Sequence, residues 1–295
     1  MIEKAVILCG GYETRMLPIT KTIPKTMLPV FDKPLIQCIM EELKECGIKK
    51  VCFIIDDNKQ IVLNHFKRNV DLEMYLQAKN KYEMLESVVK TNNMLEIEKR
   101  NDNHLGAGYA IEVAKDFVGD EPFVFCLSDE YLENNGNGTI KQLMANYYKY
   151  GKPVIAVQEV PRSEVFRYGI IDPIRVDEQT SIVKNIVEKP SVEQAPSNIS
   201  YLGNAILDKE VFSVININKI KGRKEINIPD LFENYIRNQN LLAVNIVGNR
   251  FDLGNKLGFV KANINAGLKD KTYGNELAKY ICDLADIIRM QNRWN

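Results

Sequence analysis

The sequence predicts an α/β protein with a Rossmann-like mixed, mainly parallel twisted sheet flanked by helices, a small inserted β region and C-terminal helices. In residues 1–160, short apolar segments alternate with segments whose apolar residues have helical spacing, as in β-α-β units. The first apolar segment ends in Gly10-Gly11, the way a buried parallel strand meets a glycine turn. From residue 168 to residue 207 the apolar segments have no long helices between them, which indicates an antiparallel subregion or the edge of a mixed sheet.

The elements of the first half follow in order from the period of their apolar residues. Lys4–Cys9 and Val51–Ile55 are short, almost entirely apolar runs, typical of buried strands. Lys33–Cys46 lies between them, has helical spacing and ends at Gly47, a common helix C-cap. The other expected elements are helices at Asn58–Phe66, Asp71–Val89, Gly106–Lys115 and Ile140–Lys149, and strands at Phe123–Leu127 and Pro153–Gln158.

The second half predicts shorter strands and then a return to helices. It contains no repeat, low-complexity tract or disordered linker, so we expect one domain over residues 1–295. The expected strands are Tyr168–Asp172, Ile182–Glu188 and Ser200–Leu207, and the expected helices are Pro229–Arg237, Lys256–Ala266 and Asn275–Met290.

Composition limits the classes of function. Among 295 residues, 39 Lys and Arg balance 39 Asp and Glu, and a neutral chain argues against a general nucleic-acid binder. The six cysteines form no C-x-x-C pair and only two histidines are present, which favours reduced cysteines over a zinc site. No apolar run approaches the roughly 18 residues that span a bilayer, and the first run lacks the features of a signal peptide. We therefore expect a soluble, cytoplasmic protein without a membrane partner.

Residues 9–29, CGGYETRMLPITKTIPKTMLP, have the character of an anion-binding segment. Gly10 and Gly11 allow backbone N–H groups to approach an anion closely, and Arg15 and Lys25 add positive charge on a path stiffened by prolines. A solvated basic loop after a glycine turn is the alternative, but the glycines, cations and prolines together favour a polyphosphate site. The segment matches neither G-x-x-x-x-G-K-[ST] nor G-x-G-x-x-G, which argues against the common NTPase and dehydrogenase sites.

This segment closely resembles the signature of bacterial sugar-1-phosphate nucleotidylyltransferases, G-x-G-T-R followed by L-P-x-T-x-x-x-P-K. The wider similarity is to the UTP–glucose-1-phosphate uridylyltransferases among them. Matching pieces follow in the family's order over nearly the whole chain: KTIPK at 21–25, MLP at 27–29, DKPLIQ at 32–37, NHF at 64–66, GDEP at 119–122, VEKP at 187–190, APSN at 195–198 and GNKLG at 254–258.

The resemblance implies that a nucleotidyl group passes from UTP to glucose 1-phosphate, with release of pyrophosphate and a requirement for Mg²⁺. In this reaction the sugar phosphate oxygen attacks the α-phosphorus in line, and the protein mainly aligns the reactants and shields charge. By resemblance, Arg15 and Lys25 would hold the triphosphate and stabilise the leaving pyrophosphate. Gly10, Gly11 and Thr14 would line the triphosphate cradle.

Two carboxylates far apart in the sequence are the implied magnesium ligands. Asp129, in Leu-Ser-Asp, stands where the family has Leu-Pro-Asp, and Asp252, in Phe-Asp-Leu-Gly, matches the family's aromatic-or-His-Asp-x-Gly. Mg²⁺ commonly takes one or two carboxylates together with phosphate oxygens. An aspartate after a strand is more often a turn or cap residue, but the paired motif matches outweigh that interpretation.

The resemblance also assigns residues to the sugar phosphate and to the back of the nucleotide. Glu188 and Lys189, in Glu-Lys-Pro, would receive the sugar hydroxyls and the phosphate. Gly169 and Gly203 would line the sugar pocket. Gly108, in Leu-Gly-Ala-Gly from residue 105, would back the nucleotide.

The sequence departs from the family at three positions that bear on the nucleotide. Glu13 replaces the second glycine of G-x-G-T-R, so we expect its side chain to point outwards, pair with Arg15 or weaken nucleotide binding. On this basis Glu13→Gly would leave activity unchanged or raise it. Thr26 and Asn101 replace family residues near the base, which leaves UTP, dTTP and CTP open as the nucleotide.

The domain would divide into a nucleotide-binding half (1–160), a sugar-binding β region (161–250) and the metal motif with C-terminal helices (251–295). Relatives form dimers or tetramers, so a homodimer or homotetramer is expected, with Asn275–Met290 as a plausible contact helix. A non-catalytic homologue that binds a nucleotide sugar or regulates an active partner is the alternative function, and Glu13 favours it.

Overall fold

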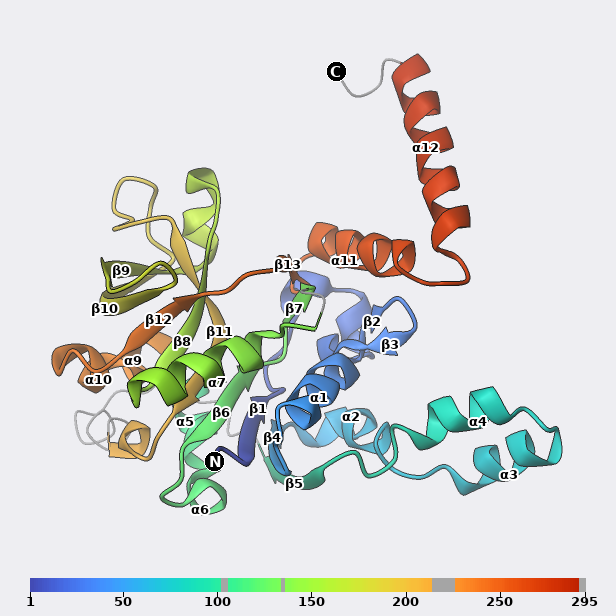
Figure 1. The fold of residues 1–295 in the computed structure, drawn as a ribbon, viewed down its shortest axis with the longest axis horizontal. Coiled ribbons are helices and arrows are strands. Elements are labelled where there is room, and N and C mark those ends of the chain that lie inside the picture. The colour runs from blue at the N-terminus through green and yellow to red at the C-terminus, as the bar shows by residue number, and fades with distance from the viewer. Residues whose placement is uncertain (102–105, 134–135, 214–225, 292–295) are drawn as a thin grey trace.

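The computed structural model of the chain describes residues 1–101, 106–133, 136–213 and 226–291. Within these ranges nine strands form one sheet in the order β5-β4-β1-β6-β11-β8-β12-β10-β9, and the pairs β13-β7 and β2-β3 lie outside it (Figure 1). This mixed sheet confirms the expected fold class. The strands are β1 (Lys4–Leu8), β2 (Pro29–Val30), β3 (Lys33–Pro34), β4 (Lys50–Ile55), β5 (Glu96–Asn101), β6 (Phe123–Leu127), β7 (Glu130–Glu133), β8 (Val154–Glu159), β9 (Gly169–Arg175), β10 (Thr180–Glu188), β11 (Ile199–Leu207), β12 (Leu242–Asn245) and β13 (Asn249–Asp252).

Helices cover both faces of the sheet, and alternate residues of each strand belong to two hydrophobic cores, one on each face. Ala5 and Ile7 point to the core shared with α1, α2 and α7, whereas Val6 points to the core shared with α5, α6, α9 and α10, because successive strand side chains lie on opposite faces. The helices are α1 (Leu35–Glu45), α2 (Gln60–Asn64), α3 (Val70–Ala78), α4 (Tyr82–Val89), α5 (Ala107–Glu112), α6 (Lys115–Val118), α7 (Thr139–Tyr150), α9 (Ile228–Leu231), α10 (Glu233–Arg237), α11 (Lys256–Leu268) and α12 (Gly274–Met290).

The strand directions divide the sheet into a parallel part and a mixed part. β5, β4, β1 and β6 run parallel, and β11 is antiparallel to both β6 and β8. β9 also pairs with β11 through Ile170 and Ser200, so β11, β8, β12, β10 and β9 close on one another. The expected antiparallel region is confirmed, but the strand expected at 200–207 lies in the middle of the sheet and not at its edge.

Several expected elements differ from those observed. The expected helix over 71–89 is two helices, α3 and α4, because the chain turns at Asn80 with a φ of +53°. The expected helix over 229–237 is likewise α9 followed by α10, and the helix expected from Lys33 begins at Leu35 because Lys33–Pro34 forms β3. The sequence interpretation missed six strands, β2, β3, β5, β7, β12 and β13. β5, EIEKRN, and β13, NRFD, contain too many charged residues to form an apolar run.

In the part of the chain that the structure describes, no helix combines the length and the apolar character needed to cross a membrane.

A carboxylate of α1 caps the N-terminus of α7, whose first N–H groups have no partner inside the helix. Glu42 Oε1 accepts a 2.6 Å hydrogen bond from the N–H of Ile140. Gly138 allows this approach, since a Cβ there would lie 2.2 Å from Glu42 Oε1.

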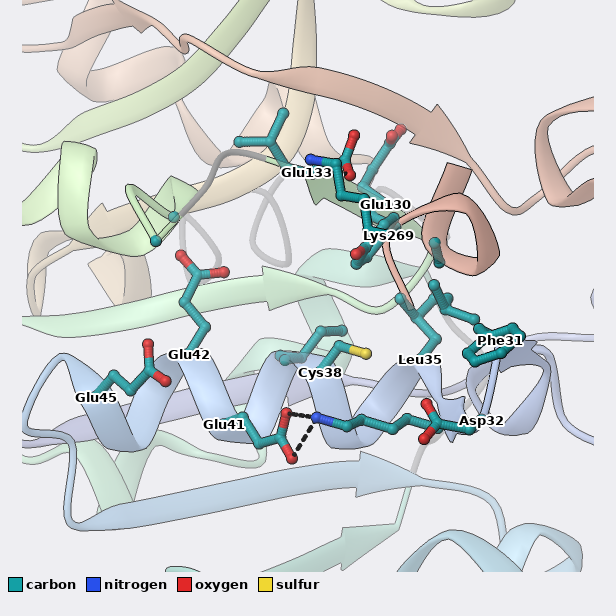
Figure 2. A pocket seen from close by; sticks show the side chains of 18 of the residues that line it. Phe31, Asp32, Leu35, Cys38, Glu41, Glu42, Glu45, Glu130, Glu133 and Lys269 are labelled. Atoms are coloured by element: carbon teal, nitrogen blue, oxygen red, sulfur yellow. Dashed lines mark hydrogen bonds and ion pairs between the residues drawn. The ribbon is translucent and has the colours of Figure 1, made fainter. Parts of the chain in front are cut away.

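Glu42 lines an acidic cavity of about 520 Å³ beside Glu41 and Glu45 (Figure 2). Burial raises the pKa of Glu42 to about 7, although the Ile140 N–H favours the charged form.

We predict that Glu42 makes the stability of the fold depend on pH. Because its pKa rises from 4.5 to about 7 on folding, the folded chain binds more protons than the unfolded chain between these values, and the free energy of unfolding falls as the pH rises across that window. Urea unfolding at about pH 5 and about pH 8 should show a loss that is smaller in Glu42→Gln by about 1–3 kcal/mol. An equal loss of stability between about pH 5 and about pH 8 in the wild type and in Glu42→Gln would contradict this assignment.

Candidate active site

A buried lysine holds the loop that follows β1. Lys59 Nζ donates to the carbonyls of Cys9 at 3.0 Å and Gly11 at 2.8 Å and to Glu13 Oε1 at 2.9 Å. Asp56 Oδ2 lies 3.7 Å from the same nitrogen. An ammonium group has three N–H donors, so the loop carbonyls and Glu13 satisfy all of them.

Glu13 points inward, and the expectations that it points outwards or pairs with Arg15 are wrong. Its backbone has a φ of 52° and a ψ of 36°, a left-handed conformation that costs a residue with a Cβ roughly 1–2 kcal/mol. Its Oε2 accepts the N–H of Lys25 at 2.7 Å, and its carbonyl accepts the hydroxyl of Thr20 at 2.9 Å. The Glu13 and Lys59 side chains are only 6% and 8% exposed, so their ion pair is part of the interior.

The two predicted metal ligands meet because β7 pairs with β13. Asp129 lies between β6 and β7, and Asp252 is the last residue of β13. In the antiparallel pair Asp252 stands opposite Glu130, the neighbour of Asp129. The N–H of Leu253 also donates to the carbonyl of Asp129 at 3.0 Å. This pairing brings two carboxylates from distant parts of the chain to the carboxyl end of β6, where ligands bind in open α/β sheets.

Two cations and two carboxylates form one cluster at this point. Lys25 Nζ lies 3.0 Å from Asp129 Oδ2, and Arg15 lies 3.6 Å from the same oxygen and 3.8 Å from Asp252 Oδ2. Burial alone would raise the pKa of Asp129, but Lys25 and then Arg15 hold that pKa below its usual value. Gly254 makes room for the cluster, since a Cβ there would lie 2.6 Å from Arg15 Nη2 and 2.7 Å from Asp252 Oδ1.

A second buried ion pair fixes the β7–β13 pair to the main sheet. Arg250 binds Glu130 through two hydrogen bonds of 2.8 and 2.6 Å, donates to Ser200 Oγ at 3.2 Å and lies over the Tyr168 ring at 4.6 Å. The Arg250 and Glu130 side chains are 9% and 13% exposed. Burial raises the pKa of Glu130, and the attraction of Arg250 opposes that rise.

Two cavities meet at Asp129, and most of the predicted site residues line them. The smaller, about 330 Å³, is lined by Gly10, Gly11 and Lys25 among others. The larger, about 510 Å³, is lined by a set that includes Arg15, Gly169, Glu188, Lys189, Gly203 and Asp252. Ala107, Leu127 and Asp129 line both cavities, so the cluster of charges stands at their junction.

Glycines shape the larger cavity around the Glu-Lys pair. A Cβ on Gly169 would lie 3.0 Å from Glu188 Oε2, and a Cβ on Gly203, whose φ is +81°, would lie 2.8 Å from Leu127. Lys189 has a φ of +47°, and its ammonium lies 3.4 Å from Glu188 Oε1. The pair is largely exposed, 46% for Glu188 and 63% for Lys189, and remains accessible to a ligand.

Four predicted nucleotide residues do not line either cavity. Thr26 is fully buried, and its hydroxyl has no hydrogen-bond partner among the residues that the structure describes. Thr14 and Asn101 line a separate hollow on the Lys59 side of the loop. Gly108 packs behind the site, where a Cβ would lie 2.3 Å from a methyl carbon of Ile226. Leu105, which precedes it in the quoted motif, lies outside the described residues.

Sequence reasoning missed the residues that support the site from behind. Nothing in the sequence distinguishes Lys59 or Arg250 from other cations, and the partners of both are distant in the chain. Tyr201 and Asn255 line the larger cavity and were also missed. For Asn255 a signal existed, because it stands in the GNKLG piece that matches the family.

The donor set suits one magnesium ion completed by substrate. Among the described residues, no group of three or more His, Cys, Asp or Glu is arranged to hold a metal. Asp129 and Asp252 lie 3.6 and 3.8 Å from the Arg15 guanidinium and offer two hard oxygen ligands, the number that Mg²⁺ takes when phosphates and water supply the rest. In the acidic cavity of Figure 2, Glu41 binds Lys33 at 2.8 Å and Glu133 binds Lys269 at 2.6 Å.

Known proteins that this chain resembles in sequence and in structure are of one kind. The nucleotidyl transferase family matches residues 4–267. A UTP–glucose-1-phosphate uridylyltransferase of Staphylococcus haemolyticus is 40% identical over 284 residues, 96% of this chain and 98% of that protein. A solved structure of a UTP-bound UGPase from Acinetobacter baumannii has a TM-score of 0.88 and 30% identity, and the match covers 96% of this chain and 100% of that one. A UDP-glucose pyrophosphorylase complexed with UDP-glucose has a TM-score of 0.79 and 32% identity over 89% of this chain and 97% of that one.

We predict that Arg250→Met destabilises the fold by about 3–5 kcal/mol, because it leaves the buried Glu130 carboxylate unpaired. The double variant Arg250→Met with Glu130→Leu should recover much of that loss, since it removes both charges. Lys90→Met, which breaks an exposed pair with Glu86, is the control and should cost less than about 1 kcal/mol. Urea unfolding measures all three, and a single variant as stable as the control would show that the pair does not hold β13.

Proposed function

Because this chain belongs to the nucleotidyl transferase family and, within it, to the UTP–glucose-1-phosphate uridylyltransferases, we propose that it transfers the uridylyl group of UTP to glucose 1-phosphate and releases pyrophosphate. The observation that carries this proposal is the cluster of Arg15, Lys25, Asp129 and Asp252 at the junction of the two cavities. A nucleotide in the smaller cavity and a sugar phosphate in the larger would present the α-phosphorus and its nucleophile at that junction.

Arg15 and Lys25 would neutralise the triphosphate and the leaving pyrophosphate. The glycine loop supplies backbone N–H groups to the same phosphates. The attacking phosphate oxygen is already ionised, so the chain needs no general base. Fixed charges that shield phosphate repulsion account for most of the catalysis that such a transfer requires.

Asp129 and Asp252 would hold Mg²⁺, which neutralises phosphate charge when bound and brings the two reacting phosphates together. Their carboxylates are already drawn towards Arg15 and Lys25. Low pKa values suit metal ligands, and the pKa of Asp129 is lowered.

Glu188 and Lys189, which line the larger cavity, would receive the sugar and its phosphate. The carboxylate can accept from sugar hydroxyls, and the ammonium can pair with the phosphate. We accordingly propose the division into a nucleotide half (1–160), a sugar region (161–250) and a metal and C-terminal segment (251–295).

The base would lie in the smaller cavity, between the glycine loop and Gly106–Ala107. Thr26 and Asn101 do not line that cavity. The difference between these two residues and the family pattern is therefore no evidence against UTP as the nucleotide. The non-catalytic alternative also loses its support, because Glu13 is neutralised by Lys59.

We also propose a cytoplasmic homodimer or homotetramer. All six cysteines are free, which suits a reducing compartment. Helix α12 extends away from the sheet (Figure 1) and exposes apolar side chains, Tyr280 at 62%, Ile287 at 50% and Met290 at 84%. A second copy would cover this face, and the mass of the purified chain by light scattering tests it: a monomer would contradict the proposal.

We predict that pyrophosphate is released when the protein meets Mg²⁺, glucose 1-phosphate and UTP. Asp129→Asn and Asp252→Asn should each lower turnover by at least about 10²-fold while the fold is kept, and Asp71→Asn, at an exposed aspartate of α3, is the control. Release with dTTP or CTP but not UTP would keep the reaction and change the nucleotide. Absence of release with every triphosphate, from folded protein, would overturn the proposed function.

A further inference from the structure

We propose that Glu13 is a positioning residue that couples the glycine loop to Lys25, so that the triphosphate meets the loop N–H groups and the Lys25 ammonium in one geometry. This inference rests on the proposed function. It reverses the expectation from sequence that glycine would serve as well at this position.

The carbonyls that Lys59 binds set the direction of the N–H groups in the glycine loop. Lys59 binds the carbonyls of Cys9 and Gly11. Because a trans peptide is planar, the N–H that follows each carbonyl points the opposite way. The N–H groups of Gly10 and Tyr12 are therefore turned away from Lys59.

The two oxygens of the Glu13 carboxylate bind different partners. Oε1 binds Lys59, which orients the loop, and Oε2 accepts the N–H of Lys25. Lys25 opens a short 3₁₀ turn, Lys25–Met27, and its side chain, 14% exposed, extends to Asp129. One carboxylate thus ties the loop and the catalytic lysine to the same buried cation.

Loss of the Glu13 carboxylate would disturb both Lys59 and Lys25. Asp56, 3.7 Å from Lys59 Nζ, would then be the nearest anion to Lys59 and would draw the ammonium from the loop carbonyls. The N–H of Lys25 would lose its acceptor at the same time. Small displacements of groups that align a reaction cost large factors in rate, so relief of the left-handed strain at residue 13 would not compensate.

The test compares Glu13→Gln and Glu13→Gly with the wild type. A glutamine keeps the size but presents an amide N–H₂ to one of two donors, so it breaks one link. Glu73→Gln is the matched control, because Glu73 is also a largely buried glutamate, 11% exposed and bound by Arg68 and Asn92, and it lines neither cavity.

We expect both Glu13 variants to lose about 10²-fold in kcat/KM for UTP, with the KM for glucose 1-phosphate within about twofold of wild type. Glu73→Gln should change the melting temperature and neither kinetic constant. Activity of Glu13→Gly at or above wild type would overturn the inference. Equal losses towards both substrates, in step with melting temperature, would also overturn it, because they would mean a merely structural role.

The failure of the proposed function remains distinguishable. If the wild type releases no pyrophosphate, the proposed function is wrong, and calorimetric titration with UTP decides the inference. Weaker UTP binding by Glu13→Gln, about tenfold or more, supports it, whereas equal binding by the variant and the wild type, or no binding by either, overturns it. If Glu13→Gly does not fold, Glu13→Gln alone decides.

Discussion

The antiparallel pairing of β7 with β13 is the constraint on which the cleft depends. It places Asp252 opposite Glu130 and therefore beside Asp129, although the two aspartates belong to distant parts of the chain. The buried pair of Arg250 with Glu130 holds this pairing against the main sheet and reaches Ser200 of β11. A loss of register here would separate the carboxylates, whatever the state of the glycine loop. The metal half of the proposed site is thus a consequence of strand pairing.

The phosphate half has a different basis, which is local neutralisation. Each charge near the junction has a partner of opposite sign: Lys25 with Asp129, Arg15 with both aspartates, and Lys59 with Glu13. Groups held in this way need little rearrangement when charge develops in a transition state. The neutral composition of the chain, 39 cations and 39 anions, therefore averages over a site in which charges are concentrated and closely paired.

How much the sequence predicts depends on the range of the interactions. The buried strands β1, β4, β6 and β8 follow from their apolar runs, and the residues that line the two cavities follow largely from the family resemblance. β7 and β13 are short and mixed in character, EYLE and NRFD, and only their pairing makes them strands. Glu13 was misread because its partner Lys59 lies 46 residues away. Thr26 and Asn101 resemble base-contacting positions in sequence, but Thr26 is buried and Asn101, the last residue of β5, lines a different hollow.

The central claim, that Asp129 and Asp252 form one metal site with the nucleotide, is tested most directly by the affinity for Mn²⁺, followed by electron paramagnetic resonance in the presence of UTP. The account predicts that Asp129→Asn and Asp252→Asn each weaken Mn²⁺ binding by at least about tenfold, and that Asp71→Asn leaves it unchanged. Wild-type affinity in either of the first two variants would contradict the claim.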